Sequence, residues 1–485
     1  MGGLDIFGSL CYHSCMREKV FTYLNDVGEQ IGVEFYLVGG TVRDGFMGVE
    51  SDDWDLVARG LEFPDLIEKL SRFGKTETTG QQFNVIRHFP GDRSLPPMEI
   101  ALPRKEYSTG IKTQDFEARY DPNMPIEKDL ERRDYSINSI AVRCSDGALI
   151  DPFDGVGDIE RGILRMLHPE SAKDDALRIV RGIRFMAKFG FTVTPDTDKQ
   201  LRENVDLLVG VSGERFQKEL LDMIVAPHVD VALNYMQSIG ALAQVFPELE
   251  EGVGCDQNQY HSYDVWTHIV QVVKHTPSDD PYVKLAALFH DIAKPAVKWS
   301  GDDGVAHFYD PEPGQEFQQA PRIAGNHEIV GADMAYHIMH QRLKFATHAS
   351  KRVAKLVREH MFIQGDKLGR RAARRFLARL ENSPGGVREN MEALFQIREG
   401  DCLGGKDSSA KEYIETNRRF RDICREELER NTAFSVKDLA LNGHDLMKLG
   451  KVGQEIGQAQ KELLSAVIDD PELNTPEALT ALITA

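Results

Sequence analysis

The chain has 485 residues, a mass of 54.5 kDa and a formal net charge of −19 at pH 7. This length is more than one hydrophobic core usually holds, so several domains are expected. No apolar run reaches about 18 residues, which argues against a membrane-spanning helix, and the start of the chain lacks a basic, apolar leader. Six scattered cysteines favour a cytosolic protein with reduced thiols.

The first third of the chain mixes short β-rich runs with glycine, proline and aspartate turns. The predicted strands are Phe35–Val38, Trp54–Val57, Met98–Leu102 and Ile137–Val142. From about residue 170 onward apolar residues recur at helical spacing, and no further strand is predicted. The pattern therefore predicts an α+β fold, with an α/β head followed by a long helical body.

An early segment, "LVGGTVRDGFMGVESDDWDLV", carries the first chemical signal. Its strand ends in Gly39-Gly40, where the missing Cβ lets a ligand approach the backbone. The next residues predict a helical turn, whose N–H groups together with Arg43 suit a triphosphate. Asp53 and Asp55 point to the same face if they lie on a strand. Such a carboxylate pair favours Mg²⁺, which takes oxygen ligands and bridges to phosphates.

A second signal lies in "DDALRIVRGIRF". Asp175, Arg178 and Arg181 are three residues apart, which on one helix places them in a sector about 120° wide. A carboxylate accepts a hydrogen bond from an exocyclic amino group, and a guanidinium donates to ring atoms. Such a pair could read cytosine and adenine, which share an amino group beside an acceptor. The alternative is an amphipathic helix with a salt-bridged face.

Four ordered motifs carry a family resemblance: "LVGGTVRD" with "DDWDLV", then "LERRDYSINSIA", "DDALRIVRGIRF" and "GERFQKELLDMI". They resemble the class II tRNA nucleotidyltransferase and bacterial poly(A) polymerase family of the polymerase β-like superfamily. The resemblance implies a polymerase β-like head with a small mixed sheet, followed by an all-helical neck and body. It also implies Mg²⁺ at Asp53 and Asp55. The nucleotide contacts that it implies are Gly40, Arg43, Arg133, Asp175, Arg178, Arg181 and Arg184.

Some positions depart from the family pattern or extend it. Asp174 stands where the family usually has Glu, which concerns the placement of the helix more than the chemistry. Glu99 is a candidate third active-site carboxylate. Arg104 and Glu106 fall in what resembles the flexible loop that the family needs for adding the terminal adenosine.

Ten of the fifteen histidines lie between residues 261 and 360. A histidine, an adjacent His-Asp pair and a distal aspartate resemble the HD metal-dependent phosphohydrolase superfamily. Two extra histidines would fit a second metal or a phosphate. Imidazole and carboxylate together suit a transition divalent metal such as Ni, Mn, Co or Fe, which would activate water against a phosphodiester. The implied ligands are His268, His290, Asp291, His327, His360 and Asp401.

Two segments of the second half suggest an RNA partner. Residues 341–380 hold twelve lysines and arginines against two acidic residues, so this segment could bind a phosphate backbone or could be a solvated helical face. The later segment "DLALNGHDLMKLG" resembles the tail of tRNA-maturing enzymes that carry an HD domain, and this implies a contact with tRNA.

The resulting prediction is a cytoplasmic CCA-adding enzyme that transfers CMP twice and AMP once, from CTP and ATP, to tRNA. Its HD domain is predicted to hydrolyse a phosphodiester such as a 2′,3′-cyclic phosphate. The predicted domains are a head (1–165), a neck (166–250), an HD domain (251–410) and a tail (411–485). The alternatives are an A-adding or CC-adding enzyme, a poly(A) polymerase, a stand-alone phosphohydrolase and a nucleic-acid-binding scaffold.

Overall fold

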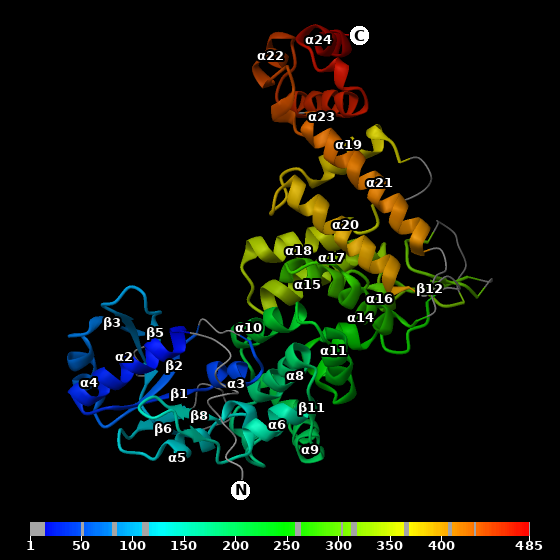
Figure 1. Cartoon of the computed structure of the whole chain (residues 1–485). Helices are drawn as coiled ribbons and strands as arrows, with labels where there is room; N and C mark the ends of the chain where they lie inside the picture. Colours follow the sequence, from blue (N-terminus) through cyan, green and yellow to red (C-terminus); the bar gives the residue numbers. More distant parts are fainter. Residues whose placement is uncertain are drawn as a thin grey trace. The chain divides into compact units, whose positions relative to one another are not determined.

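The chain forms two compact units, the first made of residues 1–212 and 239–244, the second of residues 213–238 and 245–485 (Figure 1). The computed structural model describes residues 15–49, 53–79, 85–108, 116–257, 263–301, 304–311, 318–362, 368–405, 410–430 and 433–484. Among the helices of the described residues, none is long and apolar enough to cross a membrane.

A seven-stranded mixed sheet forms the centre of the first unit, in the order β3-β4-β5-β2-β1-β8-β9. Only the pair β2–β5 is parallel. The strands are β1 (Glu34–Val38), β2 (Asp55–Arg59), β3 (Gly74–Thr79), β4 (Val85–Pro90), β5 (Met98–Ala101), β8 (Ala141–Arg143) and β9 (Leu149–Ile150). A separate hairpin pairs β6 (Arg104–Ser108) with β7 (Phe116–Tyr120), and residues 109–115 between them lie outside the described ranges.

Both faces of the central strand β1 are buried, because apolar residues occupy successive positions rather than alternate ones. Tyr36 and Val38 pack with Val57 and with Ile126 and Leu130 of the helix α5 (Ile126–Glu131). Phe35 and Leu37 point to the opposite face and are also buried. This double burial fixes the register of β1, and with it the position of the glycines that follow.

The first unit also contains helices, some beside the sheet and others in the segment that follows it (Figure 1). They are α2 (Cys15–Ile31), α3 (Gly40–Phe46), α4 (Phe63–Leu70), α5, α6 (Gly155–Arg161), α7 (Ser171–Asp174), α8 (Leu177–Phe189) and α9 (Pro195–Glu203), with the 3₁₀ turns η1 (Ser136–Asn138) and η2 (Val205–Gly210). The short strands β10 (Ile163–Leu164) and β11 (Thr192–Val193) pair in parallel. The helix α12 (Ala241–Val245) spans the division between the units.

In its described residues, the second unit is helical apart from one short hairpin of β12 (Trp299–Ser300) and β13 (Ala306–His307). Its helices are α10 (Gly213–Ile224), α11 (Val229–Ser238), α13 (Pro247–Glu250), α14 (Val265–His275), α15 (Pro281–Phe289), α16 (Lys294–Val297), α17 (His327–His337), α18 (Thr347–Glu359), α19 (Arg370–Leu380), α20 (Val387–Gly404), α21 (Ala410–Glu429), α22 (Gly443–Lys448), α23 (Gln454–Asp469) and α24 (Pro476–Thr484). A π-helical turn, η3 (Ile338–Arg342), and the 3₁₀ turns η4 (Val436–Asp438) and η5 (Pro471–Leu473) complete it.

The α+β head followed by a helical body is confirmed, but two details of the prediction are wrong. The predicted strand Ile137–Val142 is a 3₁₀ turn in its first half, and only β8 is extended. The Asn138 amide donates to Asp134 and the Ser139 hydroxyl donates to the Tyr135 carbonyl, so local side-chain bonds favour a turn there. Strands β11, β12 and β13 also occur after residue 170, and two residues are too few for a recognisable alternation.

The basic segment 341–380 is largely used for contacts within the second unit. Arg371 and Arg375 both pair with Asp469 at the end of α23. Arg374 donates to the Ile468 and Asp469 carbonyls, and Arg379 pairs with Glu359. These contacts join α19 to the end of α23 and to α18, and they favour a structural role for much of this positive charge.

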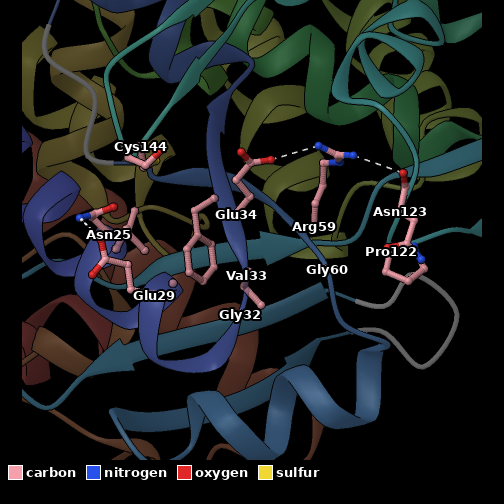
Figure 2. Close-up of a pocket in the computed structure, with 14 residues that line it drawn as sticks. Asn25, Glu29, Gly32, Val33, Glu34, Arg59, Gly60, Pro122, Asn123 and Cys144 are labelled. Atoms are coloured by element: carbon pink, nitrogen blue, oxygen red, sulfur yellow. Dashed lines mark hydrogen bonds and ion pairs between the residues drawn. The ribbon is translucent and has the colours of Figure 1, made fainter.

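The first unit contains a cavity of about 480 Å³ at the start of β1, the end opposite to Gly39 (Figure 2). Glu34, Arg59 and Cys144 are among the residues that line it, and Arg59 pairs with Glu34. None of the predicted site residues lines this cavity, so it is not the predicted nucleotide site.

Candidate active sites

The first candidate site lies where β1 ends in Gly39, which has φ +70° and therefore favours glycine. A Cβ at this position would lie 3.0 Å from Arg133 Nη1 and 3.8 Å from Asp55 Oδ2. The turn thus brings a guanidinium and a carboxylate against bare backbone. Gly40 is the first residue of α3, as the sequence pattern predicts.

Three carboxylates lie at or just before the same end of the neighbouring strands β2 and β5. Asp55 begins β2 and pairs in parallel register with Glu99 of β5. Asp53 precedes β2 rather than lying on it, and its carbonyl accepts a hydrogen bond of 2.5 Å from the Thr41 hydroxyl of α3. Burial raises the pKa of Asp55, the charges of Glu99 and Asp53 raise it further, and Arg133 opposes them. A cation bound to these oxygens would relieve this repulsion, so the donor set fits Mg²⁺.

The two arginines predicted to contact the triphosphate are held by the head itself. Arg43 is buried, and it donates to Asp44 and to the Asn138 amide oxygen at 2.5 Å. Its guanidinium also lies over the rings of Phe185 and Phe189 of α8. Arg133 donates to Asp129, whose side chain is fully buried. Both guanidinium groups therefore have fixed orientations, whereas their contact with a nucleotide stays a prediction.

The predicted base-reading residues do not share one helix, and this part of the prediction is wrong. α8 begins at Leu177, whereas Asp175 has an extended backbone and accepts from the Leu177 N–H with its carboxylate. An aspartate just before a helix satisfies an otherwise unpaired N–H group, which explains why the helix starts after it. Arg178 donates to the Ser171 hydroxyl and the Arg132 carbonyl, both at 2.7 Å.

The remaining predicted arginines of α8 lie further along this helix. Arg181 donates through Nε to Asp134 at 2.7 Å, and the Arg184 guanidinium carbon lies 4.4 Å from the centroid of the Phe185 ring. Asp134, Asp129 and Asn138 were not predicted, although they orient the site arginines. Asp134 follows directly on Arg133, but the arginine that it contacts, Arg181, is 47 residues away, so no local pattern reveals this pair.

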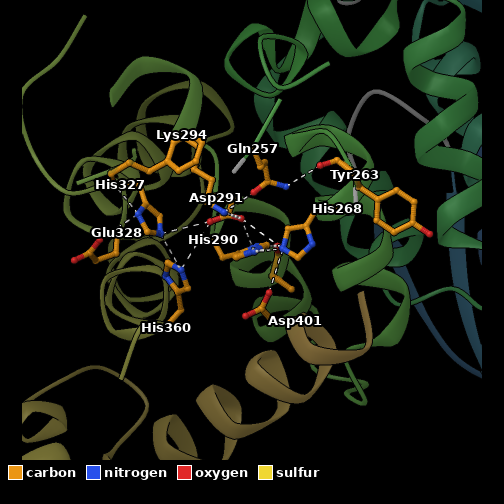
Figure 3. Close-up of polar contacts among 12 residues, drawn as sticks. Gln257, Tyr263, His268, His290, Asp291, Lys294, His327, Glu328, His360 and Asp401 are labelled. Carbon is orange, nitrogen blue, oxygen red and sulfur yellow. Dashed lines mark hydrogen bonds and ion pairs between the residues drawn. The ribbon is translucent and has the colours of Figure 1, made fainter. Parts of the chain in front are cut away.

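The second candidate site is a buried pocket in the second unit, where the structure brings together all six predicted ligands (Figure 3). Their atoms form two groups, His268 with His290 and Asp401, and Asp291 with His327 and His360, each within 4.8 Å. The ligands come from α14, α17 and α20 and from the ends of α15 and α18. Within the described part of the chain, no group of this kind is found among residues other than these six.

Asp291 lies between the two groups and directs one oxygen to each. Its Oδ2 is 3.1 Å from His290 Nε2 and 3.5 Å from His268 Nε2. Its Oδ1 is 3.5 Å from His327 Nε2 and 3.9 Å from His360 Nε2. Asp401 Oδ1 completes the first group at 3.1 Å from His268 Nε2. This arrangement suits a carboxylate that bridges two cations.

Backbone carbonyls on the side away from the pocket fix the orientation of three imidazole rings. Nδ1 of His290, His327 and His360 lies within 3.1 Å of the carbonyl oxygens of Ala287, Phe308 and Val357, respectively. A carbonyl can only accept a hydrogen bond, so Nδ1 carries the proton and Nε2 presents its lone pair to the pocket. This is the tautomer that binds a metal through Nε2.

The protonation of the pocket follows from burial and from neighbouring charges. Burial and the nearby His327 and His290 lower the pKa of His360 to about 3. Burial alone would raise the pKa of Asp291, but the charges of His290 and Lys294 hold it well below its usual range. Burial also lowers the pKa of His327, whereas in His290 the effect of burial is outweighed by Asp291 and the pKa is raised. Imidazoles beside ionised carboxylates form a donor set that fits a divalent transition metal, which takes the place of any proton on Nε2.

Two cations beside the pocket were not predicted. Lys294 is buried and places Nζ 2.7 Å from both Asp291 Oδ2 and Gln257 Oε1 (Figure 3). Arg398 donates to Asp401 Oδ2 at 2.5 Å. Each cation is three residues from its carboxylate on the chain, a spacing that allows contact within a helical turn but is common among surface ion pairs.

Family models match three parts of the chain. Residues 35–165 match the poly A polymerase head domain, and residues 190–252 match the probable RNA and SrmB-binding site of polymerase A. Residues 258–385 match the HD domain. Five of the six pocket ligands lie within the last match, and Asp401 lies beyond it.

Curated relatives resemble the chain over much of their own length. A multifunctional CCA protein of Nitrosococcus oceani is 36% identical over 291 residues, which cover 56% of this chain and 68% of that protein. An A-adding tRNA nucleotidyltransferase of Deinococcus radiodurans is 31% identical over 341 residues, covering 67% of this chain and 68% of that protein.

Solved structures show the same fold over nearly the whole chain. The CCA-adding enzyme of Bacillus stearothermophilus in complex with CTP has a TM-score of 0.67 at 19% identity, covering 97% of this chain and 98% of that one. The CCA-adding enzyme of Thermotoga maritima complexed with tRNA has a TM-score of 0.59 at 19% identity, covering 99% and 98%.

Proposed function

The chain belongs to the family of tRNA nucleotidyltransferases that includes the multifunctional CCA proteins, and we propose that it completes the CCA end of tRNA. In this proposal it transfers CMP twice and AMP once from CTP and ATP to the tRNA 3′ end, in the cytoplasm. The observation that carries the proposal is the Gly39 turn, which holds Arg133 and Asp55 against bare backbone.

The roles of the head residues follow from this turn. Asp53 and Asp55, with Glu99 opposite Asp55, would hold Mg²⁺, which stabilises the charge on the transferred phosphoryl group when bound. Arg133 stands where a triphosphate would approach Gly39, and Gly40 leaves space beside it. Arg43, held by Asp44 and Asn138, adds fixed positive charge.

Base selection is assigned to the residues around the start of α8. Asp175 would accept from the amino group of cytosine or adenine, and Arg178 would donate to the neighbouring ring atoms. Arg181, oriented by Asp134, and Arg184 would complete this surface. Reading by Arg178 requires that its bonds to Ser171 and the Arg132 carbonyl give way or leave donors available.

The extent of the addition can be tested with defined tRNA substrates. tRNAs ending at the discriminator base, at C74 and at C75 should each be extended to CCA when CTP and ATP are both present. An enzyme that extends only the tRNA ending at C75, with ATP, would instead be an A-adding enzyme like the relative of Deinococcus radiodurans. Long poly(A) products on a non-tRNA primer would indicate a poly(A) polymerase.

A second activity is proposed for the histidine pocket, because Asp291 directs one oxygen to each of two histidine groups. The pocket would hold two divalent transition metals, such as Ni, Mn, Co or Fe, which when bound supply an activated water for phosphodiester hydrolysis. Asp291 and Asp401 balance metal charge, while Lys294 and Arg398 add positive charge that favours an anionic substrate. A 2′,3′-cyclic phosphate is the proposed substrate.

The test for this activity is hydrolysis of 2′,3′-cyclic AMP by metal-free protein to which each metal is returned singly. Hydrolysis that depends on one of these metals supports the proposal. A protein that binds no transition metal and hydrolyses no phosphodiester would exclude it. The domain limits at 165, 250 and 410 remain part of this proposal, as does an RNA contact by the tail.

A further inference from the structure

Helices α14 and α20 approach each other at backbone distance beside the histidine pocket. The contact is made by two buried glycines of α20, Gly400 and Gly404. A Cβ on Gly400 would lie 2.3 Å from Oγ1 and 2.9 Å from Cα of Thr276, the residue directly after α14. A Cβ on Gly404 would lie 3.0 Å from the backbone nitrogen of Val272. Only glycine therefore permits this separation of the two helices.

These two helices also carry one ion pair of the pocket. His268 belongs to α14, and Asp401 is the residue of α20 directly after Gly400. Asp401 Oδ1 lies 3.1 Å from His268 Nε2, and its other oxygen accepts from Arg398 at 2.5 Å. Because Arg398 holds the carboxylate in one orientation, Asp401 has little freedom to swing toward His268 if its backbone moves away.

We propose that Gly400 and Gly404 are positioning residues for one half of the metal pocket, the group formed by His268, His290 and Asp401. They set the distance between α14 and α20, and through it the reach of Asp401. The part of this inference that concerns a bound metal rests on the proposed hydrolase function. The separation of His268 and Asp401 is a property of the metal-free protein.

The effect should be confined to this group. Asp291, His327 and His360 come from elements other than α20, at the end of α15, on α17 and at the end of α18. A methyl group on Gly400 moves the backbone of Asp401 without touching these three residues. The proposal therefore predicts an unequal loss of metal, which a general loss of stability would not produce.

The experiment compares Gly400→Ala with Gly457→Ala, a control in the helix α23 whose added Cβ would meet no atom within 4 Å. Bound Co²⁺ or Ni²⁺ is counted after dialysis, and the dissociation constant of each equivalent is measured by titration. Gly400→Ala should retain one equivalent and bind the second about tenfold or more weakly. The control should match the wild type.

Adding Asp401→Glu to Gly400→Ala supplies the missing reach, so the double variant should regain part of the second equivalent. A crystal structure of metal-free Gly400→Ala should show His268 and Asp401 beyond hydrogen-bond distance. Two tightly bound equivalents, or an unchanged His268–Asp401 distance, would overturn the inference. A wild type that binds no metal would contradict the proposed hydrolase instead, and the metal-free structure would still decide the role of the glycines.

Discussion

The two candidate sites differ in how much of each is assembled by the protein alone. In the histidine pocket, side chains from several helices bring two sets of three ligand atoms within 4.8 Å, and nearly all of these residues are buried. In the head, Asp53 and Glu99 are exposed and Asp55 is partly buried. The side chains of Arg133 and Asp55 lie against the backbone of Gly39.

This difference indicates two ways of holding a cation. Burial raises the pKa of Asp55, and Glu99 and Asp53 raise it further against the effect of Arg133, so a cation that joins these carboxylates would relieve their repulsion. The pocket already holds its ligands in place, because Lys294 and Arg398 contact the two carboxylates and backbone carbonyls orient three of the imidazoles. The head therefore depends on its substrate for a complete site, whereas the pocket can hold metal before any substrate arrives.

The largest expected effect is on nucleotide transfer. Asp55→Asn removes the charge at the centre of the head carboxylates and should lower CMP and AMP incorporation by about 10³-fold or more, because the metal then loses its main ligand. Retention of tRNA by filter binding should be nearly unchanged, since phosphate contacts elsewhere supply that affinity. Asp65→Asn, on the exposed start of α4, is the matched control.

The two activities should separate in this variant. Hydrolysis of a cyclic phosphate by Asp55→Asn should equal that of the wild type, because the ligands of the histidine pocket lie in the other compact unit. A simultaneous loss of both activities at unchanged stability would contradict the division into two independent sites.

A loss of similar size is expected for hydrolysis when the shared ligand of the pocket is removed. Asp291→Ala takes away the carboxylate that faces both histidine pairs, so both metal equivalents should be lost and hydrolysis should fall by about 10³-fold. His360→Ala should affect mainly one equivalent. The readouts are metal content and hydrolysis, with the exposed His348→Ala as control. Full metal content in Asp291→Ala would exclude the bridging role.

A smaller effect is expected for base choice. Asp175→Ala should lower the use of CTP and ATP and increase the relative use of UTP or GTP by about 10- to 100-fold, because a polar pocket discriminates by leaving its own groups unpaired against the wrong base. Arg178→Ala should lower the use of both correct nucleotides. The measurement is incorporation of each single triphosphate on tRNA that ends at the discriminator base.

The outcome also depends on a contact seen only in the structure. Asp175 accepts from the Leu177 N–H, so its replacement could act through the start of α8. Asp175→Asn keeps an acceptor for that N–H and is the matched variant. Unchanged preference for CTP and ATP in both variants would place base reading elsewhere.

The sequence predicted the ligands of the pocket but not their surroundings. His290-Asp291 and the distant histidines are unusual residue types at recognisable spacing, so they stand out in a single sequence. Lys294 and Arg398 are ordinary residues whose importance depends on what they touch. Pairs such as Arg371 with Asp469 join residues nearly a hundred positions apart, and no local pattern reveals them.

In the head, too, the sequence predicted local features but not the contacts that orient them. The buried β1 and the glycines after it follow from local residue preferences. The start of α8 could not be placed from periodicity, because the Asp175 carboxylate takes the place of a helical hydrogen bond there. The orientation of Arg43 also depends on Asn138, which is far from it in sequence.

The smallest effect concerns stability, and it extends the contrast between the sites to a single buried histidine. His88 of β4 is fully buried in the head, and Nε2 lies 2.7 Å from the Tyr23 hydroxyl. Unlike the pocket residue His290, which has Asp291 beside it, it has no carboxylate among its described partners. Burial lowers the pKa of His88 to about 4. The unfolded chain therefore takes up this proton more readily than the folded head.

The contribution of His88 to the free energy of unfolding should therefore be constant above about pH 6.5. It should fall as the pH decreases from about 6.5 to 4 and should level off below pH 4. The slope is about 1.4 kcal/mol per pH unit, and the total loss of unfolding free energy is about 3 kcal/mol. His88→Gln cannot take up the proton and can still bond to Tyr23, so it should lose less stability over this range. The free energy of unfolding of the wild type and of His88→Gln is measured by denaturant unfolding at pH 7 and pH 4.5. The exposed His444→Gln is the control. Parallel losses in the wild type and His88→Gln would show that this histidine does not link protonation to unfolding of the head.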